Sequence, residues 1–245
     1  MAAIKTLPTG ANKHTFCPGC GHGIVNRLIR ECIEELGYQD NYCFALAVGC
    51  SCNLHSQKGD FFQAAHGRAG AAATGIKRTR PDMLVIAYQG DGDAGVIGLA
   101  ETLNAAYRNE NLSVIIINNT NFGMTGGKMS WTTMPGEVTT TSTAGRNCDY
   151  NGYPQHLPEM IANSFSHIAY SARGSVADVK HIMETKKMIK KALQNQIDKA
   201  GYSIVEVLSP CPTNWHLDPL KSCDRIENEL YPEYPLGEFK TREDK

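Results

Sequence analysis

The sequence predicts an α/β fold in which helices cover both faces of a doubly wound, parallel β-sheet. Five short runs of β-type residues recur along the chain, and most are continuously apolar, as expected for strands buried on both faces. Segments with helical periodicity lie between these runs. The expected strands are 42–48, 83–88, 112–117, 167–171 and 202–208, and the expected helices are 21–36, 67–79, 94–108 and 175–199.

The predicted elements have local signals as well. The first helix carries its apolar residues on one face and ends at Gly37. The second and third strands, with the sequences MLVIAY and LSVIII, are apolar runs of β type, and a polar motif follows each of them. The alternation of strand with helix is what favours a parallel sheet over an antiparallel one.

Three segments fall outside this alternation. Residues 1–16 are expected to be an irregular lead-in, whereas 120–159, rich in Gly, Thr, Met, Asn and Pro, are a long irregular stretch of the kind that tends to be functional. The tail after Pro210 carries aromatic residues among prolines and charges, and is not expected to build a core of its own. We therefore expect a domain at 1–215 and a C-terminal arm at 216–245 that packs on a partner subunit or on its own domain.

Composition excludes several classes of protein. A net charge of −1 gives no reason to expect nucleic acid or a membrane surface as a partner. No apolar run approaches the roughly 20 residues that span a bilayer, and the first residues lack a signal-peptide pattern. The nine cysteines cannot all pair, so reduced thiols in a cytoplasmic protein are expected.

Two strand ends carry the strongest functional signal. Asp91, within Gly90-Asp91-Gly92, follows the second strand, and Asn119 follows the third. Both are hard oxygen ligands of the kind that Mg²⁺ takes while sharing its shell with phosphate and water. The two glycines leave room for a phosphate, and a helix that begins near Asp93 offers amide groups to an anion. The pattern predicts a site for Mg²⁺ and a diphosphate.

Residues on both sides of this motif could extend the site. His66 could donate a hydrogen bond to a phosphate that Gly67 allows to approach, although a helix-capping role is the alternative. Asn121 is placed to offer its backbone carbonyl to the metal. The following residues could line a pocket or permit tight turns: Phe122, Gly123, Met124 and Thr125.

The cysteines suggest a second site. Cys17 and Cys20 form a CxxC before the first helix, which is typical of a redox dithiol or of half a zinc knuckle, but no second CxxC follows at the usual spacing. Cys50 and Cys52 follow the first strand, and Cys211 follows the last. Two thiolates from the CxxC and two distant ones would suit a [4Fe–4S] cluster. Spacing alone does not decide between Cys50 and Cys52.

Seven short motifs occur in order along the chain: CPGCGHG (17–23), VGCS (48–51), AAHGR (64–68), GDGD (90–93), INN (117–119), GMTGG (123–127) and SPCPT (209–213). Together they resemble the thiamine-diphosphate-binding β subunits of 2-oxoacid:ferredoxin oxidoreductases, over roughly residues 14–215. AAHGRA, ATGIK, YQGDGD and GMTGG look most similar to the branched-chain, 2-oxoisovalerate type. The fold implied is the diphosphate-binding domain of thiamine enzymes.

The resemblance also implies ligands. The [4Fe–4S] cluster would be held by Cys17, Cys20, Cys50 and Cys211. Mg²⁺ would be held by Asp91, Asn119 and the carbonyl of Asn121. The other residues expected around thiamine diphosphate are Val48, Gly49, Cys50, Ser51, His66, Gly67, Gly90, Gly92, Asp93, Gly123, Met124 and Thr125.

The activity implied is oxidative decarboxylation of a 2-oxoacid to acyl-CoA and CO₂, with coenzyme A as a substrate and electrons passing through the cluster to ferredoxin. An α subunit would supply the glutamate that activates the aminopyrimidine, so no catalytic residue is assigned here. Further γ and ferredoxin-like δ subunits are expected.

Two positions depart from the family pattern. The family usually has Gln where this chain has Lys128, and Pro where it has Trp131. We expect both to reshape the pocket for the acid, which leaves the choice of 2-oxoacid open. Two other functions remain alternatives. An iron–sulfur electron-transfer subunit would leave GDGD and INN unexplained, and a non-redox thiamine-dependent decarboxylase subunit would leave the cysteines unexplained.

Overall fold

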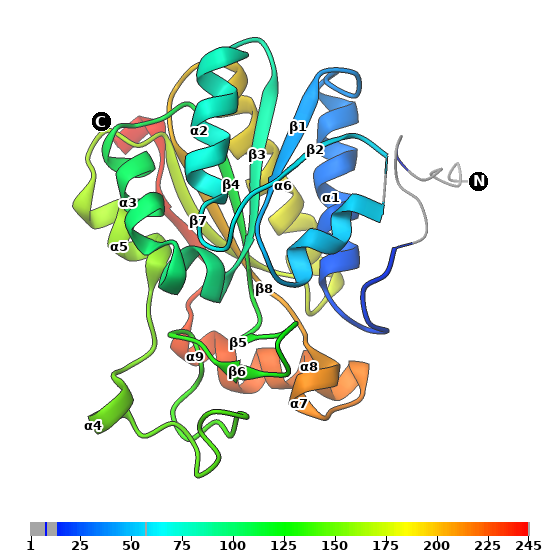
Figure 1. The fold of residues 1–245 in the computed structure, drawn as a ribbon, viewed down its shortest axis with the longest axis vertical. Helices are drawn as coiled ribbons and strands as arrows, with labels where there is room; N and C mark the ends of the chain where they lie inside the picture. The colour runs from blue at the N-terminus through cyan, green and yellow to red at the C-terminus, as the bar shows by residue number, and fades with distance from the viewer. Residues whose placement is uncertain (1–7, 9–13, 57, 245) are drawn as a thin grey trace.

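A seven-stranded sheet forms the centre of the computed structural model, which describes Pro8 and residues 14–56 and 58–244 (Figure 1). The strands of this sheet are β1 (Tyr42–Leu46), β2 (Asp60–Gln63), β3 (Leu84–Gly90), β4 (Ser113–Asn118), β7 (Tyr170–Ser175), β8 (Ser203–Leu208) and β9 (Gly237–Lys240). They follow the order β2-β1-β3-β4-β8-β7-β9. All neighbours pair in parallel except β9, which is antiparallel to β7. The predicted fold class is confirmed.

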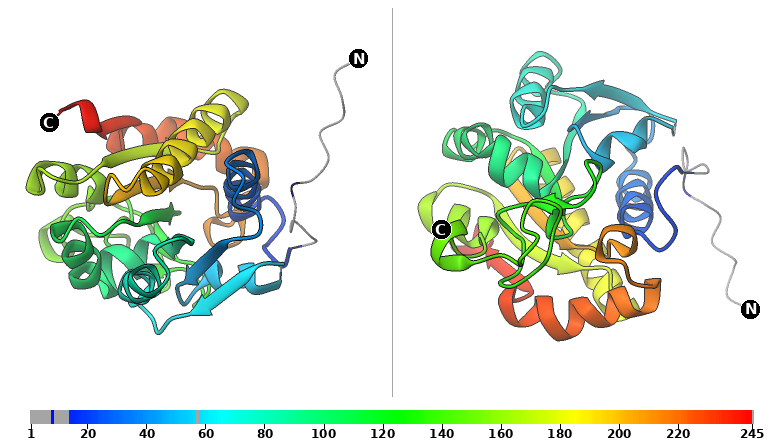
Figure 2. Two further views of the ribbon diagram at one scale, coloured as in Figure 1. Left: turned by 90° about the horizontal axis from the view of Figure 1, so that it is seen from above. Right: turned by 60° about the horizontal axis from the view of Figure 1, so that its bottom comes forward.

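Helices cover both faces of the sheet (Figure 2). The longer ones are α1 (His22–Glu35), α2 (Ala69–Thr79), α3 (Leu99–Tyr107), α5 (Leu157–Ser164) and α6 (Val179–Ile197). On one face, α1 and α6 pack against side chains such as Phe44. On the other, α2, α3 and α5 pack against small strand residues such as Ala45 and Ala87. Successive strand residues point to opposite faces, so continuously apolar strands fill both cores. None of the helices in the described residues is long and apolar enough to cross a membrane.

Two predicted helices differ from the structure at their first turns. The helix expected over 94–108 is divided into a π-helical turn, η2 (Asp93–Ile97), and α3, with Gly98 between them. A side chain at Gly98 would meet the carbonyl oxygen of Gly67 at 2.4 Å, so the chain needs glycine at this close approach. The helix expected from 175 begins only at Val179, because the side chain of Asp178 accepts a hydrogen bond from the His181 amide and caps it.

The segment 120–159 is largely irregular, as predicted. A small antiparallel hairpin of β5 (Asn121–Phe122) and β6 (Lys128–Met129) opens it, and the one-turn helix α4 (Cys148–Asn151) lies near its end. In Figure 1 this segment lies below the sheet, at the end where β3 and β4 finish. It therefore lies at the edge where open α/β sheets bind ligands.

The first part of the C-terminal segment, residues 212–233, also lies at this edge, whereas β9 runs back along the sheet and the C-terminal end lies at its other side (Figure 1). The helical elements of the C-terminal segment are α7 (Pro212–Trp215), α8 (Pro219–Arg225), η3 (Ile226–Leu230), α9 (Tyr231–Glu233) and η4 (Arg242–Asp244). One further element, the 3₁₀ turn η1 (Cys50–Ser56), follows β1. Buried residues of this tail, Trp215, Ile226, Leu230 and Tyr234, form one cluster with Cys211 and with Leu208 of β8. The tail therefore packs against its own domain. Contact of the arm with a partner subunit stays a prediction.

Candidate functional site

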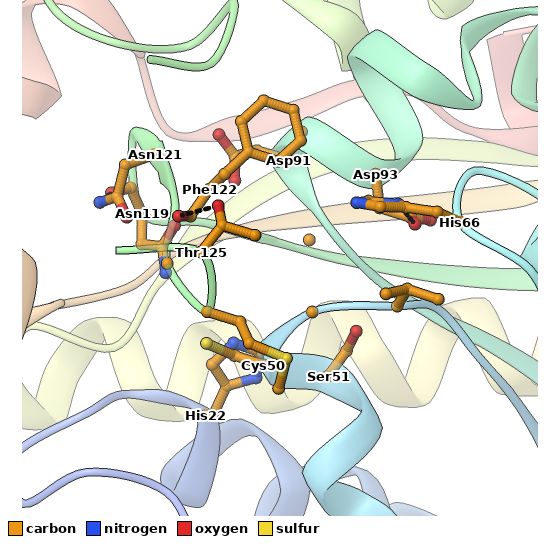
Figure 3. A pocket seen from close by; sticks show the side chains of 16 residues that line it. His22, Cys50, Ser51, His66, Asp91, Asp93, Asn119, Asn121, Phe122 and Thr125 are labelled. Atoms are coloured by element: carbon orange, nitrogen blue, oxygen red, sulfur yellow. Dashed lines mark hydrogen bonds and ion pairs between the residues drawn. The ribbon is translucent and has the colours of Figure 1, made fainter. Parts of the chain in front are cut away.

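A cavity opens at the carboxyl ends of β3 and β4 (Figure 3). Every residue predicted to surround the cofactor lines it, except Gly67. The lining residues are His22, Val48, Gly49, Cys50, Ser51, His66, Gly90, Asp91, Gly92, Asp93, Asn119, Asn121, Phe122, Gly123, Met124 and Thr125.

The expected Mg²⁺ ligands lie on adjacent strand ends. Asp91 directly follows β3, and Asn119 follows β4, whose register pairs Gly90 with Ile117. Asp91 is only 3% exposed, and burial raises its pKa to about 7, although a hydrogen bond from the Thr132 hydroxyl acts in the opposite direction. A buried carboxyl with a raised pKa is a group that a cation would stabilise as the anion.

The expected Mg²⁺ ligands are mostly uncharged oxygens rather than a cluster of carboxylates. Within the described residues, no three His, Cys, Asp or Glu side chains gather around one point to hold an ion. The proposed set instead combines one carboxylate, Asp91, with oxygens of Asn119 and Asn121. Mg²⁺ accepts so few protein ligands when a diphosphate and waters complete its octahedral shell.

Asp93 has a different environment from Asp91. Its carboxylate accepts hydrogen bonds from the Gly67 amide at 2.8 Å and from Gln89 Nε2 at 2.7 Å, and it also contacts His66 Nδ1. Asp93 thereby orients the His66 ring at the cavity wall, which Figure 3 shows. Gly67 does not line the cavity, because its amide is directed to Asp93 instead. A Cβ there would also meet the Gly98 amide at 2.8 Å.

A second cavity is lined by all four cysteines predicted to hold a cluster: Cys17, Cys20, Cys50 and Cys211. Cys52 is not among its lining residues. All four are free thiols. Burial raises the pKa of Cys20 and of Cys50 to about 12, and the neighbouring cysteines add to the rise. Such thiols need a metal to become thiolates.

The spacing of these thiols bears on which metal group they suit. No three of them converge on one point, as a single tetrahedral zinc ion would require. A [4Fe–4S] cluster binds each cysteine through a different iron atom, so its thiolates are spread around a larger group. The four cysteines line one cavity, and they do not form the arrangement of a single-ion site.

Comparison with known proteins places this geometry in a family. Residues 47–207 match the model of the thiamine pyrophosphate enzyme, C-terminal TPP binding domain. The chain is 36% identical to the 2-oxoglutarate synthase subunit KorB of Methanocaldococcus jannaschii, over 97% of this chain and 91% of that protein. The chain belongs to the family of thiamine-pyrophosphate-binding β subunits of 2-oxoacid:ferredoxin oxidoreductases.

Two further similarities concern sequence and fold. This β subunit is 45% identical to the ketoisovalerate oxidoreductase subunit VorA of Methanothermobacter thermautotrophicus, over 93% of its own length but 48% of that relative. It thus spans about half the length of that relative. Its fold matches a chain of the 2-oxoglutarate:ferredoxin oxidoreductase from Magnetococcus marinus, with a TM-score of 0.75, 22% identity, and coverage of 95% of this chain and 83% of that one.

The two cavities of the β subunit share one wall. Cys50, Asn119, Gly123 and Met124 line both. Gly123 is packed so closely in this wall that a Cβ would lie 3.2 Å from Cys50 Sγ and 3.6 Å from Asn119 Nδ2. The expected cofactor site and the expected cluster site are therefore separated by a single layer of residues.

Buried polar atoms test whether a polar ligand fits the first cavity. Ser51 is 1% exposed, and its hydroxyl has no hydrogen-bond partner within the described residues. Leaving a buried hydroxyl unpaired costs about 1–3 kcal/mol. Ser51 lines the cavity, so a phosphate oxygen placed there would satisfy this atom.

The residue set predicted from the sequence omitted His22. His22 lines the cavity, and its Nδ1 lies 2.7 Å from the hydroxyl of Tyr88. Burial lowers its pKa to about 3, so the ring is neutral at physiological pH. Its position two residues after Cys20 was the available signal, but the contact with Tyr88 depends on how α1 packs on β3.

Lys128 and Trp131 are not among the residues that line either cavity. Lys128 is exposed on β6, and Trp131 is 43% exposed. The Trp131 carbonyl accepts hydrogen bonds from the Gln155 amide and from Arg146 Nη1. The structure thus does not bring these two side chains to the cofactor, and their effect on substrate choice stays a prediction.

Proposed function

We propose that this β subunit acts within an oxidoreductase that converts a 2-oxoacid and coenzyme A to acyl-CoA and CO₂ and passes the electrons to ferredoxin. The observation that carries the proposal is the wall shared by the two cavities. An electron-transfer subunit would not need the first cavity, and a non-redox decarboxylase subunit would not need the second. Only a redox thiamine enzyme uses both, side by side.

The residues of this chain would bind and orient the groups. Thiamine diphosphate supplies the electron sink for loss of CO₂, and a [4Fe–4S] cluster accepts single electrons. Asp91 and Asn119 would hold Mg²⁺ together with the Asn121 carbonyl. Ser51 would donate to a phosphate oxygen, and so would His66, whose ring Asp93 orients. The four cysteines of the second cavity would hold the cluster.

Catalysis would require a partner. The residues that line the first cavity include no glutamate. We infer that an α subunit supplies the glutamate that activates the aminopyrimidine, and that γ and ferredoxin-like δ subunits complete the enzyme. A cytoplasmic location fits such an assembly.

The substrate proposed is a branched-chain 2-oxoacid of the 2-oxoisovalerate type. Its support is the 45% identity to the ketoisovalerate oxidoreductase subunit, against 36% to the 2-oxoglutarate synthase subunit. Lys128 and Trp131 would adjust this preference through the loop beside the site. A panel of 2-oxoacids tested on Lys128→Gln and Trp131→Pro variants checks their role, and an unchanged preference in both would exclude it.

The test of the whole proposal is anaerobic purification of the chain with its partner subunits, followed by metal and thiamine analysis and assays of ferredoxin reduction. We expect bound iron, sulfide, Mg²⁺ and thiamine diphosphate, and reduction that needs both 2-oxoacid and coenzyme A. Iron without thiamine diphosphate would identify an electron-transfer subunit instead. Thiamine diphosphate with zinc, or with no metal in the cysteine cavity, would identify a non-redox enzyme.

The metal site has its own test in Asp91→Asn. Without ligands, the variant should melt at or above the temperature of the natural protein, because a buried carboxyl that is costly to ionise has been removed. Mg²⁺ with thiamine diphosphate should raise the melting temperature of the natural protein but not of the variant. Asp82→Asn, at an exposed aspartate, is the matched control and should keep the full ligand-induced rise.

A further inference from the structure

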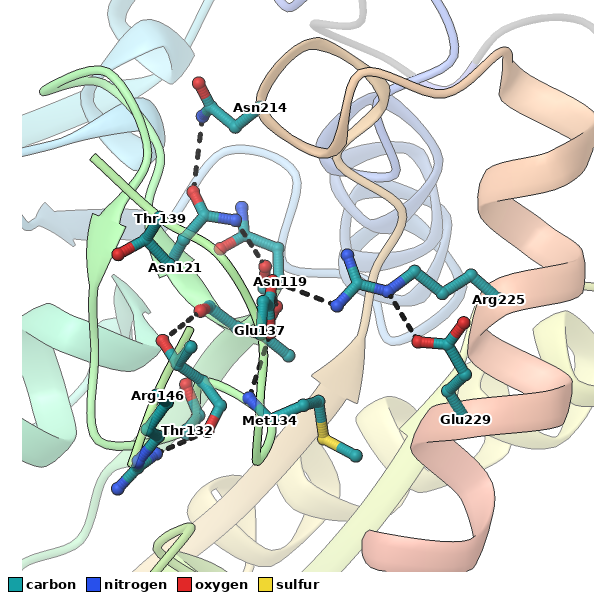
Figure 4. A network of polar contacts seen from close by, with 12 residues as sticks. Asn119, Asn121, Thr132, Met134, Glu137, Thr139, Arg146, Asn214, Arg225 and Glu229 are labelled. Atoms are coloured by element: carbon teal, nitrogen blue, oxygen red, sulfur yellow. Dashed lines mark hydrogen bonds and ion pairs between the residues drawn. The ribbon is translucent and has the colours of Figure 1, made fainter. Parts of the chain in front are cut away.

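Asn214 connects the two cavities through its side chain. It lies in α7, three residues after Cys211. Its Nδ2 donates to the Gly123 carbonyl at 2.9 Å, to Asn121 Oδ1 at 3.2 Å and to Cys211 Sγ at 3.5 Å. Figure 4 shows Asn214 pointing toward Asn121. One amide group therefore contacts both the loop expected to bind the metal and a sulfur expected to bind the cluster.

The position of this amide is fixed by close packing. A Cβ on Gly127 would lie 3.1 Å from the Asn214 Cβ and 3.3 Å from its Oδ1. A Cβ on Gly123 would lie 3.4 Å from Asn214 Nδ2. Glycines at both positions let the backbone of the loop close around the Asn214 side chain. The donor that faces Cys211 is therefore held by the loop.

The contacts continue to the expected Mg²⁺ ligands. Asn121 Nδ2 donates to the Asn119 carbonyl at 2.6 Å, while Asn121 Oδ1 accepts from Asn214. Asn119 and Asn121 are the two asparagines assigned to the metal above. A chain of amide hydrogen bonds thus runs from the metal loop through Asn214 to the sulfur of Cys211.

We propose that Asn214 is a positioning residue that raises the reduction potential of the cluster and makes this potential depend on whether the Mg²⁺–thiamine diphosphate site is filled. The inference rests on the proposed function, because it requires both groups. Reduction adds one negative charge to the cluster. An N–H donor at a cluster sulfur stabilises this charge and raises the potential. Metal binding at Asn119 and Asn121 would hold Asn121 Oδ1 in place, and this oxygen accepts the hydrogen bond that orients Asn214 Nδ2.

The test is a redox titration, followed by electron paramagnetic resonance, of the anaerobically purified enzyme with all partner subunits. The signal of this cluster is identified as the one missing from a Cys211→Ser variant. We expect Asn214→Ala to lower the equilibrium constant for reduction about tenfold, which is about 59 mV for a one-electron couple. Asn228→Ala, at an exposed asparagine outside both cavities, is the matched control and should leave the potential unchanged.

Removal of Mg²⁺ and thiamine diphosphate with a chelator tests the dependence on the cofactor. The potential should fall in the natural enzyme and stay constant in Asn214→Ala. If Asn214→Ala loses iron, Asn214→Leu keeps nearly the same size without an Nδ2 donor or a charge, and should show the same lowered potential. A natural enzyme that lacks iron or thiamine diphosphate would overturn the proposed function. An enzyme that holds both, with equal potentials in the natural form and the variant that retains iron, would overturn the role of Asn214 alone.

Discussion

Asp91 and Asp93 lie two residues apart and are both buried, but their hydrogen bonds differ. Asp93 accepts from Gly67 and Gln89 and contacts His66, so protein groups satisfy its carboxylate. Burial of Asp91 outweighs the hydrogen bonds it accepts, and its pKa rises to about 7. The motif GDGD therefore contains one carboxylate suited to a cation and one that holds the wall of the site.

Gly92 lies between these two aspartates, and a side chain at this position would reduce the space in the cavity. A Cβ here would lie 2.4 Å from the Phe122 ring, although the backbone φ of −68° would accept any residue. Gly92→Ala should push Phe122 into the cavity and weaken thiamine diphosphate binding at least about tenfold, since overpacking costs about 1–3 kcal/mol. Isothermal titration calorimetry measures the affinity.

The control is Gly75→Ala, at an exposed position of α2 where a Cβ would meet nothing within 4 Å. It should raise the free energy of unfolding by about 0.5–1 kcal/mol, because alanine is more stable than glycine in the interior of a helix. The affinity for thiamine diphosphate should stay unchanged. Equal affinities in both variants would show that Gly92 does not limit the cofactor space.

How far a residue could be predicted depended on the range of its contacts. Asp91 and Asn119 were predictable, because parallel strands bring their ends to one edge. His22 was not, since its partner Tyr88 is 66 positions away and is met only through the packing of α1. Gly67 shows the converse: its motif is local, but the direction of its amide depends on Asp93.

Among the elements, the long loop after β4 is ordered by one buried cation. Arg146 is 3% exposed and lies at the centre of the loop. Its guanidinium donates to backbone carbonyls at Trp131, Thr133, Asn151, Gly152 and Tyr153. Thr132, between two of these carbonyls, donates to Asp91, so the order of the loop reaches the metal site.

Arg146→Met should therefore loosen the loop. Losing several hydrogen bonds of about 1 kcal/mol each should speed amide exchange across residues 131–153 by more than about tenfold. Hydrogen–deuterium exchange with mass spectrometry reports it. Arg80→Met, at an arginine that is exposed and pairs with Asp82, should leave exchange in the loop unchanged. Protection that survived in Arg146→Met would mean that other contacts hold the loop.

Short elements were the least predictable. The sequence analysis expected neither β2 nor β9, each four residues long and at an edge of the sheet. Edge strands are partly exposed, so they lack the continuous apolar run that marks β3 and β4. Their pairing is determined by the neighbouring strand instead.

Across the whole molecule, Arg173 joins the C-terminal segment to the sheet. Its side chain is fully buried in β7 and forms ion pairs with Glu206 of β8 and Glu159 of α5. It also lies 5.2 Å from the ring centroids of both Tyr234 and Phe239. Arg173 thus connects elements that are distant in sequence around one charge.

Arg173→Met should lower the free energy of unfolding by about 3–5 kcal/mol, because it leaves Glu206 buried without its cation. Urea denaturation measures the loss, and adding Glu206→Gln to the variant should recover part of it. Lys191→Met removes a pair with Glu238 in which both side chains are 37% exposed, and should cost less than about 1 kcal/mol. Similar losses in both variants would argue against a structural role for the buried network.

Exposed aromatic residues on the long loop after β4 suggest where a partner subunit binds. Tyr150 is 88% exposed and Tyr153 is 74% exposed, and Trp131, on the same loop, is 43% exposed. Exposed apolar surface beside a functional site is typical of a protein interface. The α subunit proposed to supply the activating glutamate would approach this end of the sheet, where the loop lies. We therefore expect the loop to contact the α subunit.

The double variant Tyr150→Ser with Tyr153→Ser should weaken assembly with the α subunit at least about tenfold, because aromatic side chains often dominate binding energy at interfaces. Its melting temperature as an isolated chain should stay the same, since both side chains are exposed before assembly. Tyr107→Ser, at a tyrosine of α3 that is also 74% exposed, is the matched control. Analytical ultracentrifugation distinguishes the outcomes: assembly lost only in the double variant supports the loop as the interface, whereas equal assembly in all three proteins places the α subunit elsewhere.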